Sequence, residues 1–250
     1  MSQASQIDPA KLAAARAAVA LVEDGMRLGL GTGSTASVMV RELAARVAAE
    51  GLSLRCAATS KATAGLAESL GLKIESLDAI GWLDMTIDGA DEVDPQLHLI
   101  KGGGAAHLRE KIVAAASDRM VVIADPGKVV EVLGAFPLPV EVLEFGFETT
   151  RKLIRRALEG LELGEHDILQ RLKGSDPVVT DEGNLILDLH LEVIPDPSAL
   201  ARALSCIPGV VEHGLFLGMC DLAIIGRDDG SVIELARNDI DADMLAQEGE

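Results

Sequence analysis

The sequence predicts an α/β protein in which a Rossmann-like parallel sheet domain carries a smaller inserted α+β domain. In the first half of the chain, short apolar runs alternate with helical patterns, as in βαβ units around a parallel sheet. From about Phe136 the order changes to strand, helix, strand, strand, helix, which is typical of an antiparallel α+β module. We therefore expect residues 1–133 and 213–250 to form the parallel-sheet domain, and residues 134–212 to form a ferredoxin-like insertion.

The expected elements follow in chain order. Asp8 is a favourable N-cap for a first helix, Pro9 suits its first turn, and Gly25 is expected to end it. Apolar runs predict buried strands at residues 26–30, 54–58, 83–87 and 120–124, with helices starting at Ser34, Lys61 and Gly104. The insertion is expected to contain strands at 138–142, 168–172 and 184–190, and helices at 148–158 and 195–204. Strands at 221–226 and 231–235 then rejoin the first domain, before a solvated acidic tail.

Composition excludes several classes of protein. Lys and Arg number 22 against 40 Asp and Glu, which gives a formal net charge of −18, and aromatic residues make up only 2%. A nucleic acid is therefore a poor partner, because its phosphates require basic surfaces. No apolar stretch approaches the roughly 18 residues of a membrane span. We therefore expect a soluble protein. Its cysteines, Cys56, Cys206 and Cys220, are odd in number and lack Cys-x-x-Cys spacing, which favours the reducing cytoplasm over a disulfide framework or a zinc site.

A glycine-rich segment, Gly29-Leu30-Gly31-Thr32-Gly33-Ser34-Thr35, lies between a predicted strand and a predicted helix. Exposed backbone N–H groups and a helix N-terminus would hold a phosphate there. A tight turn with Ser34 or Thr35 as the helix cap explains the same residues equally well. The glycine spacing differs from the dinucleotide-binding fingerprint. Thr59, Ser60 and Thr63 follow the next strand and are interpreted more readily as a cap than as a site.

An acidic segment, Asp88-Gly89-Ala90-Asp91-Glu92-Val93-Asp94, is expected to be an open loop after a buried strand. Lys101 and three glycines, Gly102-Gly103-Gly104, follow it. Consecutive glycines are unfavourable for backbone entropy, so they usually mark a close approach to the main chain. Carboxylates suit a divalent metal, but the segment lacks the calcium-loop pattern and Lys101 is available to neutralise it. We expect no metal site, and none of the five histidines is paired like a metal ligand.

These groups suit proton abstraction from a carbon next to a carbonyl. The pattern places Glu110 two turns into the helix after the glycines, shielded from water as a general base requires. Asp88 and Asp91, in an open loop, are better suited to orienting hydroxyls. A fixed ammonium, that of Lys101, would stabilise the enediolate that proton removal creates.

Four ordered motifs resemble those of the A-type ribose-5-phosphate isomerase family. They are Gly31-Thr32-Gly33-Ser34-Thr35, Asp88-Gly89-Ala90-Asp91-Glu92, Lys101-Gly102-Gly103-Gly104-Ala105-Ala106 with Arg109-Glu110-Lys111, and Phe136-Pro137-Leu138-Pro139-Val140-Glu141-Val142. The resemblance runs from the first helix to Gly226 and includes Gly214-Leu215-Phe216. His107-Leu108 and Glu144 depart from the family pattern without removing a catalytic group.

The resemblance implies reversible conversion of ribose 5-phosphate to ribulose 5-phosphate, without cofactor or metal, in the non-oxidative pentose phosphate pathway. It also implies a homodimer or homotetramer. Glu110 would be the proton acceptor, with Asp88, Asp91 and Lys101 as the other catalytic residues. The implied substrate-binding residues are Thr32, Gly33, Ser34, Thr35, Asp88, Gly89, Ala90, Asp91, Lys101, Gly102, Gly103, Gly104 and Lys128.

Two other functions compete with catalysis by an isomerase. Related folds serve as sugar-phosphate-sensing domains of transcription regulators, but this chain is strongly acidic, has no evident DNA-binding segment and retains Lys101 and Glu110, which sensing does not require. A nicotinamide-dependent dehydrogenase is disfavoured by the glycine spacing and by the lack of a suitably placed acidic residue after the second strand.

Overall fold

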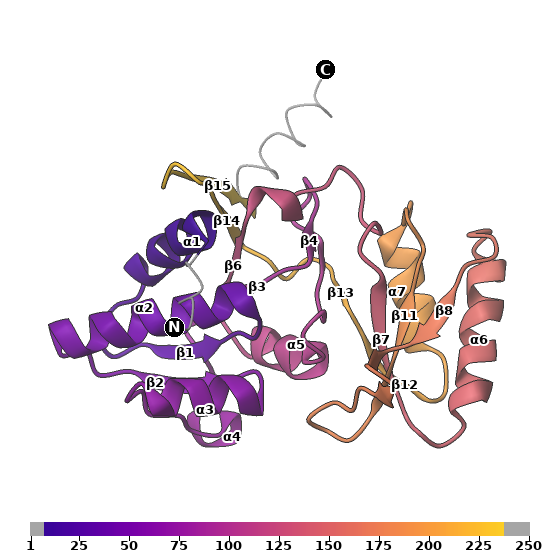
Figure 1. Ribbon diagram of the computed structural model, residues 1–250, viewed down its shortest axis with the longest axis horizontal. Coiled ribbons are helices and arrows are strands. Elements are labelled where there is room, and N and C mark those ends of the chain that lie inside the picture. The colour runs from indigo at the N-terminus through magenta and orange to yellow at the C-terminus, as the bar shows by residue number, and fades with distance from the viewer. Residues whose placement is uncertain (1–7, 238–250) are drawn as a thin grey trace. The chain divides into compact units, whose positions relative to one another are not determined.

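The computed structural model describes residues 8–237, which form two compact units (Figure 1). The first unit comprises the described residues of Met1–Gly89, Ile112–Val129 and Met219–Glu250. The second comprises Ala90–Lys111 and Val130–Gly218. The domain boundaries expected from the sequence stay a prediction, and they differ from these units mainly at residues 90–111. The expected acidic tail lies outside the described residues.

A six-stranded, mostly parallel sheet forms the centre of the first unit. Its order is β15-β14-β6-β3-β1-β2, and only the β14–β15 pair is antiparallel. The strands are β1 (Arg27–Leu30), β2 (Arg55–Ala58), β3 (Met85–Gly89), β6 (Met120–Ala124), β14 (Leu222–Gly226) and β15 (Val232–Ala236). The predicted parallel sheet is therefore confirmed, with strand starts within two residues of those expected.

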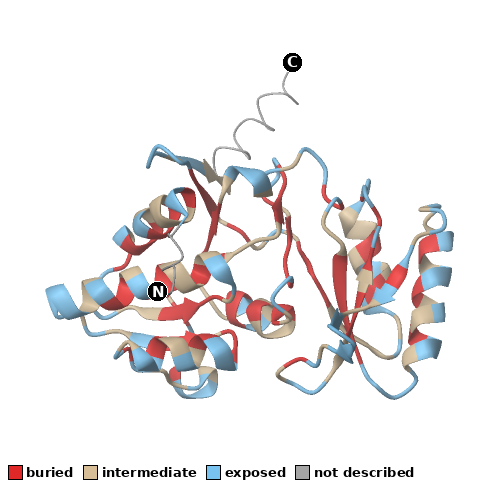
Figure 2. Cartoon of the chain, in the orientation of Figure 1, coloured by how far each residue is buried: buried red, intermediate tan, exposed pale blue. Residues whose placement is uncertain are grey.

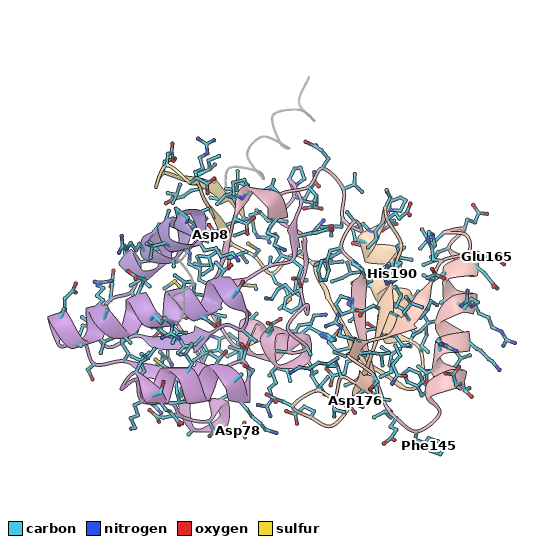
Figure 3. The ribbon with its side chains drawn as sticks, viewed as in Figure 1. Asp8, Asp78, Phe145, Glu165, Asp176 and His190 are labelled. Atoms are coloured by element: carbon cyan, nitrogen blue, oxygen red, sulfur yellow. The ribbon has the colours of Figure 1, made fainter. Side chains whose placement is uncertain are left out.

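The helices of this sheet are α1 (Pro9–Ala20), α2 (Ser34–Glu50), α3 (Lys61–Ser69) and α4 (Leu77–Ile80), with a 3-10 turn, η1, at Pro126–Lys128. Asp8, labelled in Figure 3, caps α1 by accepting the N–H of Ala10 at 2.9 Å, as predicted. The prediction that Gly25 ends this helix is wrong: α1 ends at Ala20, and Gly25 forms a later turn with φ +85°. The short helix α4 was not predicted.

Apolar strands and small helical residues form the core of the first unit. Figure 2 shows the central strands as buried, and Leu28, Ile87 and Ile123 have no exposed surface. Alanines of α1 pack against this sheet. Gly226 on β14 allows the close fit, because a Cβ there would overlap the backbone of Ala10. No helix among residues 8–237 is long and apolar enough to cross a membrane.

The second unit contains a four-stranded antiparallel sheet in the order β12-β7-β11-β8. Its elements are β7 (Leu138–Val142), α6 (Phe147–Gly160), β8 (Ile168–Gln170), β11 (Leu185–Leu189), α7 (Pro197–Ser205) and β12 (Val210–His213). This βαββαβ succession confirms the ferredoxin-like prediction. The strand β12 was not predicted. The expected strand at 168–172 ends early, and a hairpin of β9 (Leu172–Lys173) and β10 (Asp176–Pro177) follows.

The second unit also contains a small antiparallel sheet and most of the first turns of one further helix. The sheet order is β13-β5-β4, with β4 at Glu92–Val93, β5 at Leu99–Ile100 and β13 at Leu215–Phe216. The helix α5 spans His107–Ala115, and its residues 107–111 belong to the second unit. It was predicted to start at Gly104 but starts three residues later, because Gly102 and Ala105 adopt φ values of +110° and +61°. Glu110 therefore lies in the first turn, not two turns into the helix.

Candidate active site

Three of the predicted site segments leave the first unit's sheet at one edge. β1, β3 and β6 are parallel neighbours, so their carboxyl ends share that edge. The Thr32 loop follows β1, Asp88 lies near the end of β3, and Lys128 lies on η1 after β6. Open parallel sheets bind ligands at this edge.

The hydroxyl of Thr32 lies among three others. Its Oγ1 is 2.7 Å from the hydroxyl of Thr59, 2.8 Å from that of Ser60 and 3.1 Å from that of Thr63. Thr63 also donates to the carbonyl of Gly31 at 3.0 Å, and Ser60 caps α3. The hydroxyls of Thr59, Ser60 and Thr63 therefore hold the Thr32 loop in place. Ser60 is also the helix cap that the sequence predicted.

Asp88 is a buried strand residue. The expectation of an open loop is wrong for this carboxylate, which has no exposed surface. Its Oδ1 accepts the N–H of Thr32 at 3.0 Å and that of Gly89 at 2.7 Å. Gly31 permits this packing, because a Cβ there would overlap the carboxylate. Asp88 therefore fixes the course of the Thr32 loop.

The N-terminus of α2 presents polar groups to solvent. Gly33 is its N-cap, with φ +114°, and Ser34 and Thr35 form its first turn. Lys11 on α1 donates from Nζ to Ser34 Oγ at 3.0 Å, which brings an ammonium to this helix end. A helix N-terminus and a cation together suit an anion. Lys11 was not predicted as a site residue, because its place in the sequence is that of an ordinary surface position on a helix.

A buried ion pair, Lys101 with Glu110, lies in the second unit. Lys101 Nζ is 3.3 Å from Glu110 Oε2, and the two side chains are only 2% and 3% exposed. Lys101 directly follows β5, where its N–H donates to the carbonyl of Gly214 at 2.9 Å. Little solvent screens these charges, so they interact more strongly than a surface pair. The pair places a carboxylate proton acceptor beside a fixed cation.

Side chains closely approach the glycine run, as the sequence predicted. A Cβ at Gly102 would come within 2.8 Å of His107 Nδ1, and one at Gly103 within 2.6 Å of Asp91 Oδ1. The N–H of Gly103 donates to Asp91 Oδ2 at 2.7 Å. The glycines therefore bring Asp91 onto the backbone just after Lys101.

Arg171, which was not predicted, lies between β8 and β9 and holds the same glycine run. Its Nη1 donates to the carbonyls of Gly102, at 2.6 Å, and Gly103, at 3.2 Å. Its Nε donates to Asp188 on β11 at 2.8 Å, and Nη2 donates to the same carboxylate. Nothing local in the sequence marks Arg171, since the contacts join segments about seventy residues apart.

The other two carboxylates of the acidic segment organise the backbone. Glu92 on β4 accepts the N–H groups of Gly134 at 2.7 Å and Phe136 at 2.5 Å. Asp94 accepts that of His98 at 2.8 Å. These bonds give both residues structural roles.

Two buried side chains, those of His107 and Glu141, lie close to each other near the glycine run. His107 Nε2 is 3.9 Å from Glu141 Oε2, and both side chains are at most 1% exposed. Burial, with a further contribution from the Lys111 charge, lowers the pKa of His107 to about 3. Burial raises the pKa of Glu141, although Asn184 and Thr180 donate hydrogen bonds to it at 2.8 Å. The imidazole is therefore neutral at pH 7.

A polar pocket lies in the second unit, where Figure 3 labels His190 and Glu165. It is also lined by Arg155, His166, Asp167 and Glu192. Among residues 8–237 no group of three or more His, Cys, Asp or Glu side chains is placed to hold a metal ion.

Within each unit the structure brings predicted residues into contact: Thr32 and Gly89 with Asp88, Asp91 with Gly103, and Lys101 with Glu110. Ala90 and Gly104 continue the same segments, and Lys128 shares the sheet edge of Thr32. The fold and these contacts define an α/β protein equipped to hold an anion and to move protons.

Comparison with known proteins identifies the family. The family model described as ribose 5-phosphate isomerase A (phosphoriboisomerase A) matches residues 55–230. Ribose-5-phosphate isomerase A of Dinoroseobacter shibae is 58% identical over 91% of this chain and 88% of its own length. That of Cereibacter sphaeroides is 58% identical over 92% and 88%. The chain belongs to the ribose 5-phosphate isomerase A family.

Solved structures support the same assignment. Ribose 5-phosphate isomerase A from Methanocaldococcus jannaschii is 39% identical, with a TM-score of 0.82 over 90% of this chain and 97% of that one. The Plasmodium falciparum enzyme is 34% identical, with a TM-score of 0.85 over 90% and 97%. A further D-ribose-5-phosphate isomerase structure, 35% identical with a TM-score of 0.84 over 93% and 100%, is a complex with phospho-erythronic acid.

Proposed function

We propose that this chain interconverts ribose 5-phosphate and ribulose 5-phosphate through an enediolate, in the non-oxidative pentose phosphate pathway. The observation that carries the proposal is the buried pair of Lys101 and Glu110, 3.3 Å apart. Membership of the isomerase family supports the substrate. The pair also favours catalysis over sugar-phosphate sensing, since a sensor needs no proton acceptor.

The phosphate end of the substrate is assigned to the Thr32 loop, comprising Thr32, Gly33, Ser34 and Thr35. The N-terminus of α2 and the Lys11 ammonium beside Ser34 support this assignment, because both attract an anion. Lys128 supplies a further cation at the same sheet edge.

Proton transfer is assigned to Glu110. Its carboxylate removes the proton from carbon 2 of the aldose, and the C1 carbonyl oxygen takes up the electron pair as an enediolate. The proton of the C2 hydroxyl then moves to the C1 oxygen, the same carboxyl group returns its proton to carbon 1, and the C2 oxygen becomes the ketone carbonyl. The Lys101 ammonium stabilises the oxyanion, whose charge develops only during the reaction.

The remaining polar groups orient the sugar. Asp88 and Asp91 are assigned to its hydroxyls, and Gly89, Ala90, Gly102, Gly103 and Gly104 are assigned to substrate binding through their backbone. Asp91 is already set by its bond to Gly103, and Asp88 by its bond to Thr32. The reaction as assigned requires neither metal nor cofactor.

We place the protein in the cytoplasm as a homodimer or homotetramer, with no nucleic-acid or membrane partner. Its three cysteines are free thiols, which suits a reducing compartment. The net charge of −18 opposes binding to phosphate backbones.

Incubation of the purified protein with ribose 5-phosphate, followed by an assay for ketose, tests the function. We expect ketose to form from ribose 5-phosphate and far more slowly from unphosphorylated ribose. Absence of ketose would contradict the isomerase assignment, and equal rates on both sugars would contradict the phosphate site.

A further inference from the structure

The ring of Phe216 lies beside two lysine side chains in the second unit, of which Lys101 is buried and Lys111 is partly buried. Lys101 Nζ is 5.4 Å from the ring centroid, and Lys111 Nζ is 4.9 Å from it. Both distances are within the range of an attractive cation–π contact. The ring has no exposed surface and the Lys101 side chain is only 2% exposed, so water weakens the attraction between these two groups little.

The backbone fixes the ring relative to Lys101. Phe216 on β13 pairs with Leu99 on β5, and Leu215 pairs with Ile100, the residue before Lys101. The N–H of Lys101 then donates to Gly214. Lys101 and Phe216 thus extend from two neighbouring strands that are joined in register, which leaves little freedom in their relative position.

Each ammonium also has its own carboxylate. Lys101 pairs with Glu110 at 3.3 Å, and Lys111 pairs with Glu212 at 2.7 Å and donates to the His213 carbonyl at 2.6 Å. The carboxylate of Glu110 is assigned above to the moving proton, so its charge changes during the reaction. The π-electrons of Phe216 are a constant negative surface for Lys101 through that change.

We propose that Phe216 is a positioning residue that holds the Lys101 ammonium in place through its π-electrons while Glu110 gains and loses the proton. The inference rests on the proposed function, because it assigns the ring's effect to the role of Lys101. Neither size nor apolar character suffices for this role, since an aliphatic side chain fills the space without attracting a cation.

Site-specific incorporation of phenylalanine with one, two or three ring fluorines tests the proposal. Fluorine withdraws π-electron density with little change in size, so the cation–π attraction weakens stepwise while packing is retained. At position 216 we expect log kcat to fall with each fluorine, to a total loss of about 2- to 30-fold. KM should change much less, and the melting temperature should follow that of the control series.

Phe147 provides the matched control, because its ring packs against the apolar core of the same unit. The same series at Phe147 should leave kcat unchanged. A flat kcat at position 216, or an equal fall at Phe147, would overturn the proposal.

Lys101→Met separates this proposal from the proposed function. If Lys101→Met lowers kcat strongly but fluorination does not, Phe216 has no positioning role and the function of Lys101 stands. If Lys101→Met leaves kcat unchanged, the proposed role of Lys101 fails and the inference fails with it. In the Lys101→Met background, fluorination should have no further effect, and a persisting effect would show that the ring acts by another route.

Discussion

At the residue scale, the proposed chemistry depends on the difference between charge that is present throughout the reaction and charge that appears during it. A phosphate carries the same charge before and after proton transfer, so groups that hold it bind substrate and transition state alike. The enediolate oxygen becomes negative only as the proton leaves. Lys101, buried against Glu110, is placed for the second task, and the Thr32 loop for the first.

Lys101→Met should therefore lower kcat far more than it raises KM. Loss of one fixed donor to a developing oxyanion commonly costs about 10²- to 10³-fold in rate. Steady-state kinetics of Lys101→Met measures the effect, with the exposed Lys173 on β9, changed to Met, as the control. A rise in KM at unchanged kcat would contradict a role in the transition state.

Thr32→Val should have the opposite kinetic effect. It keeps the shape but removes the hydroxyl that contacts Thr59, Ser60 and Thr63. A lost hydrogen bond of about 1 kcal/mol corresponds to a KM about 5-fold higher, with kcat nearly unchanged. Thr149→Val, at an exposed position of α6, is the control. If Thr32→Val lowers kcat and leaves KM as it was, the loop does not act by binding phosphate.

At the element scale, the segment from β5 to α5 determines where Lys101, Asp91 and Glu110 lie. Gly102 and Ala105 turn the chain through left-handed conformations, and Arg171 holds the carbonyls of Gly102 and Gly103. This turn before the helix puts Glu110 in the first helical turn. Its carboxylate there lies 3.3 Å from the Lys101 ammonium.

Gly103→Ala tests the tight packing of this segment. Its Cβ would lie 2.6 Å from Asp91 Oδ1, so the carboxylate must move away from the Gly103 N–H. Loss of a hydrogen bond to a charged group costs about 1.5–3 kcal/mol, which predicts a fall in kcat/KM of about 10- to 160-fold. Parental kcat/KM in Gly103→Ala would show that the position of Asp91 does not matter.

Gly65→Ala is the matched control for this substitution. Gly65 lies inside α3, where an added Cβ meets nothing within 4 Å. Alanine is favoured over glycine in a helix by up to about 1 kcal/mol. Urea unfolding should show equal or greater stability for Gly65→Ala, with unchanged kcat/KM.

The sequence allowed correct prediction of the elements whose signals are local. Asp8 and Pro9 mark the start of α1, and the apolar run at 120–124 is a strand with the expected bounds. Local signals failed where contacts in the tertiary structure determine the burial of a side chain or the start of a helix. The burial of Asp88 depends on Gly31, which follows the neighbouring strand β1, and the late start of α5 depends on backbone turns.

The candidate site shows the same limit. Its motif residues were predicted because glycines, carboxylates and Lys101 cluster along the chain. Lys11 and Arg171 were missed because each reaches the site only through folding: Lys11 through the packing of α1 near α2, and Arg171 from the strand region of the insertion. Phe216 appeared as part of a motif, but nothing in the sequence placed its ring near two lysines.

At the scale of the whole molecule, two buried histidines make folding sensitive to acid. Burial, and then the Lys111 charge, lowers the pKa of His107 to about 3 and that of His213 to about 4. Below the ordinary pKa of 6.5 the unfolded chain binds protons that the folded chain does not, so stability falls as pH drops from about 6.5 towards 4. The limiting slope is about 1.4 kcal/mol per pH unit for each histidine. The raised pKa of Glu141 acts in the opposite direction and reduces the net slope.

His107→Leu should remove one of these two contributions. The free energy of unfolding is measured in urea at pH 7 and at pH 5. Its change between these pH values should be smaller for His107→Leu than for the parent, by up to about 1.4 kcal/mol per pH unit. An unchanged pH dependence would show that His107 does not bind its proton preferentially in the unfolded state.

The central claim is that Glu110 carries the proton between carbons 1 and 2. Glu110→Gln keeps the shape of the side chain but removes its basicity. The rival carboxylates are Asp88 and Asp91, tested as Asp88→Asn and Asp91→Asn. Glu159→Gln, at an exposed position of α6, is the control for the chemical change.

The most direct measurement is incorporation of carbon-bound deuterium into the sugar phosphate in heavy water. For Glu110→Gln we expect the rate to fall by at least about 10²-fold, the lower end of general-base contributions, while the folded state and substrate binding are retained. Exchange at nearly the parental rate in Glu110→Gln, together with its loss in Asp88→Asn or Asp91→Asn, would contradict the assignment of Glu110 as the base.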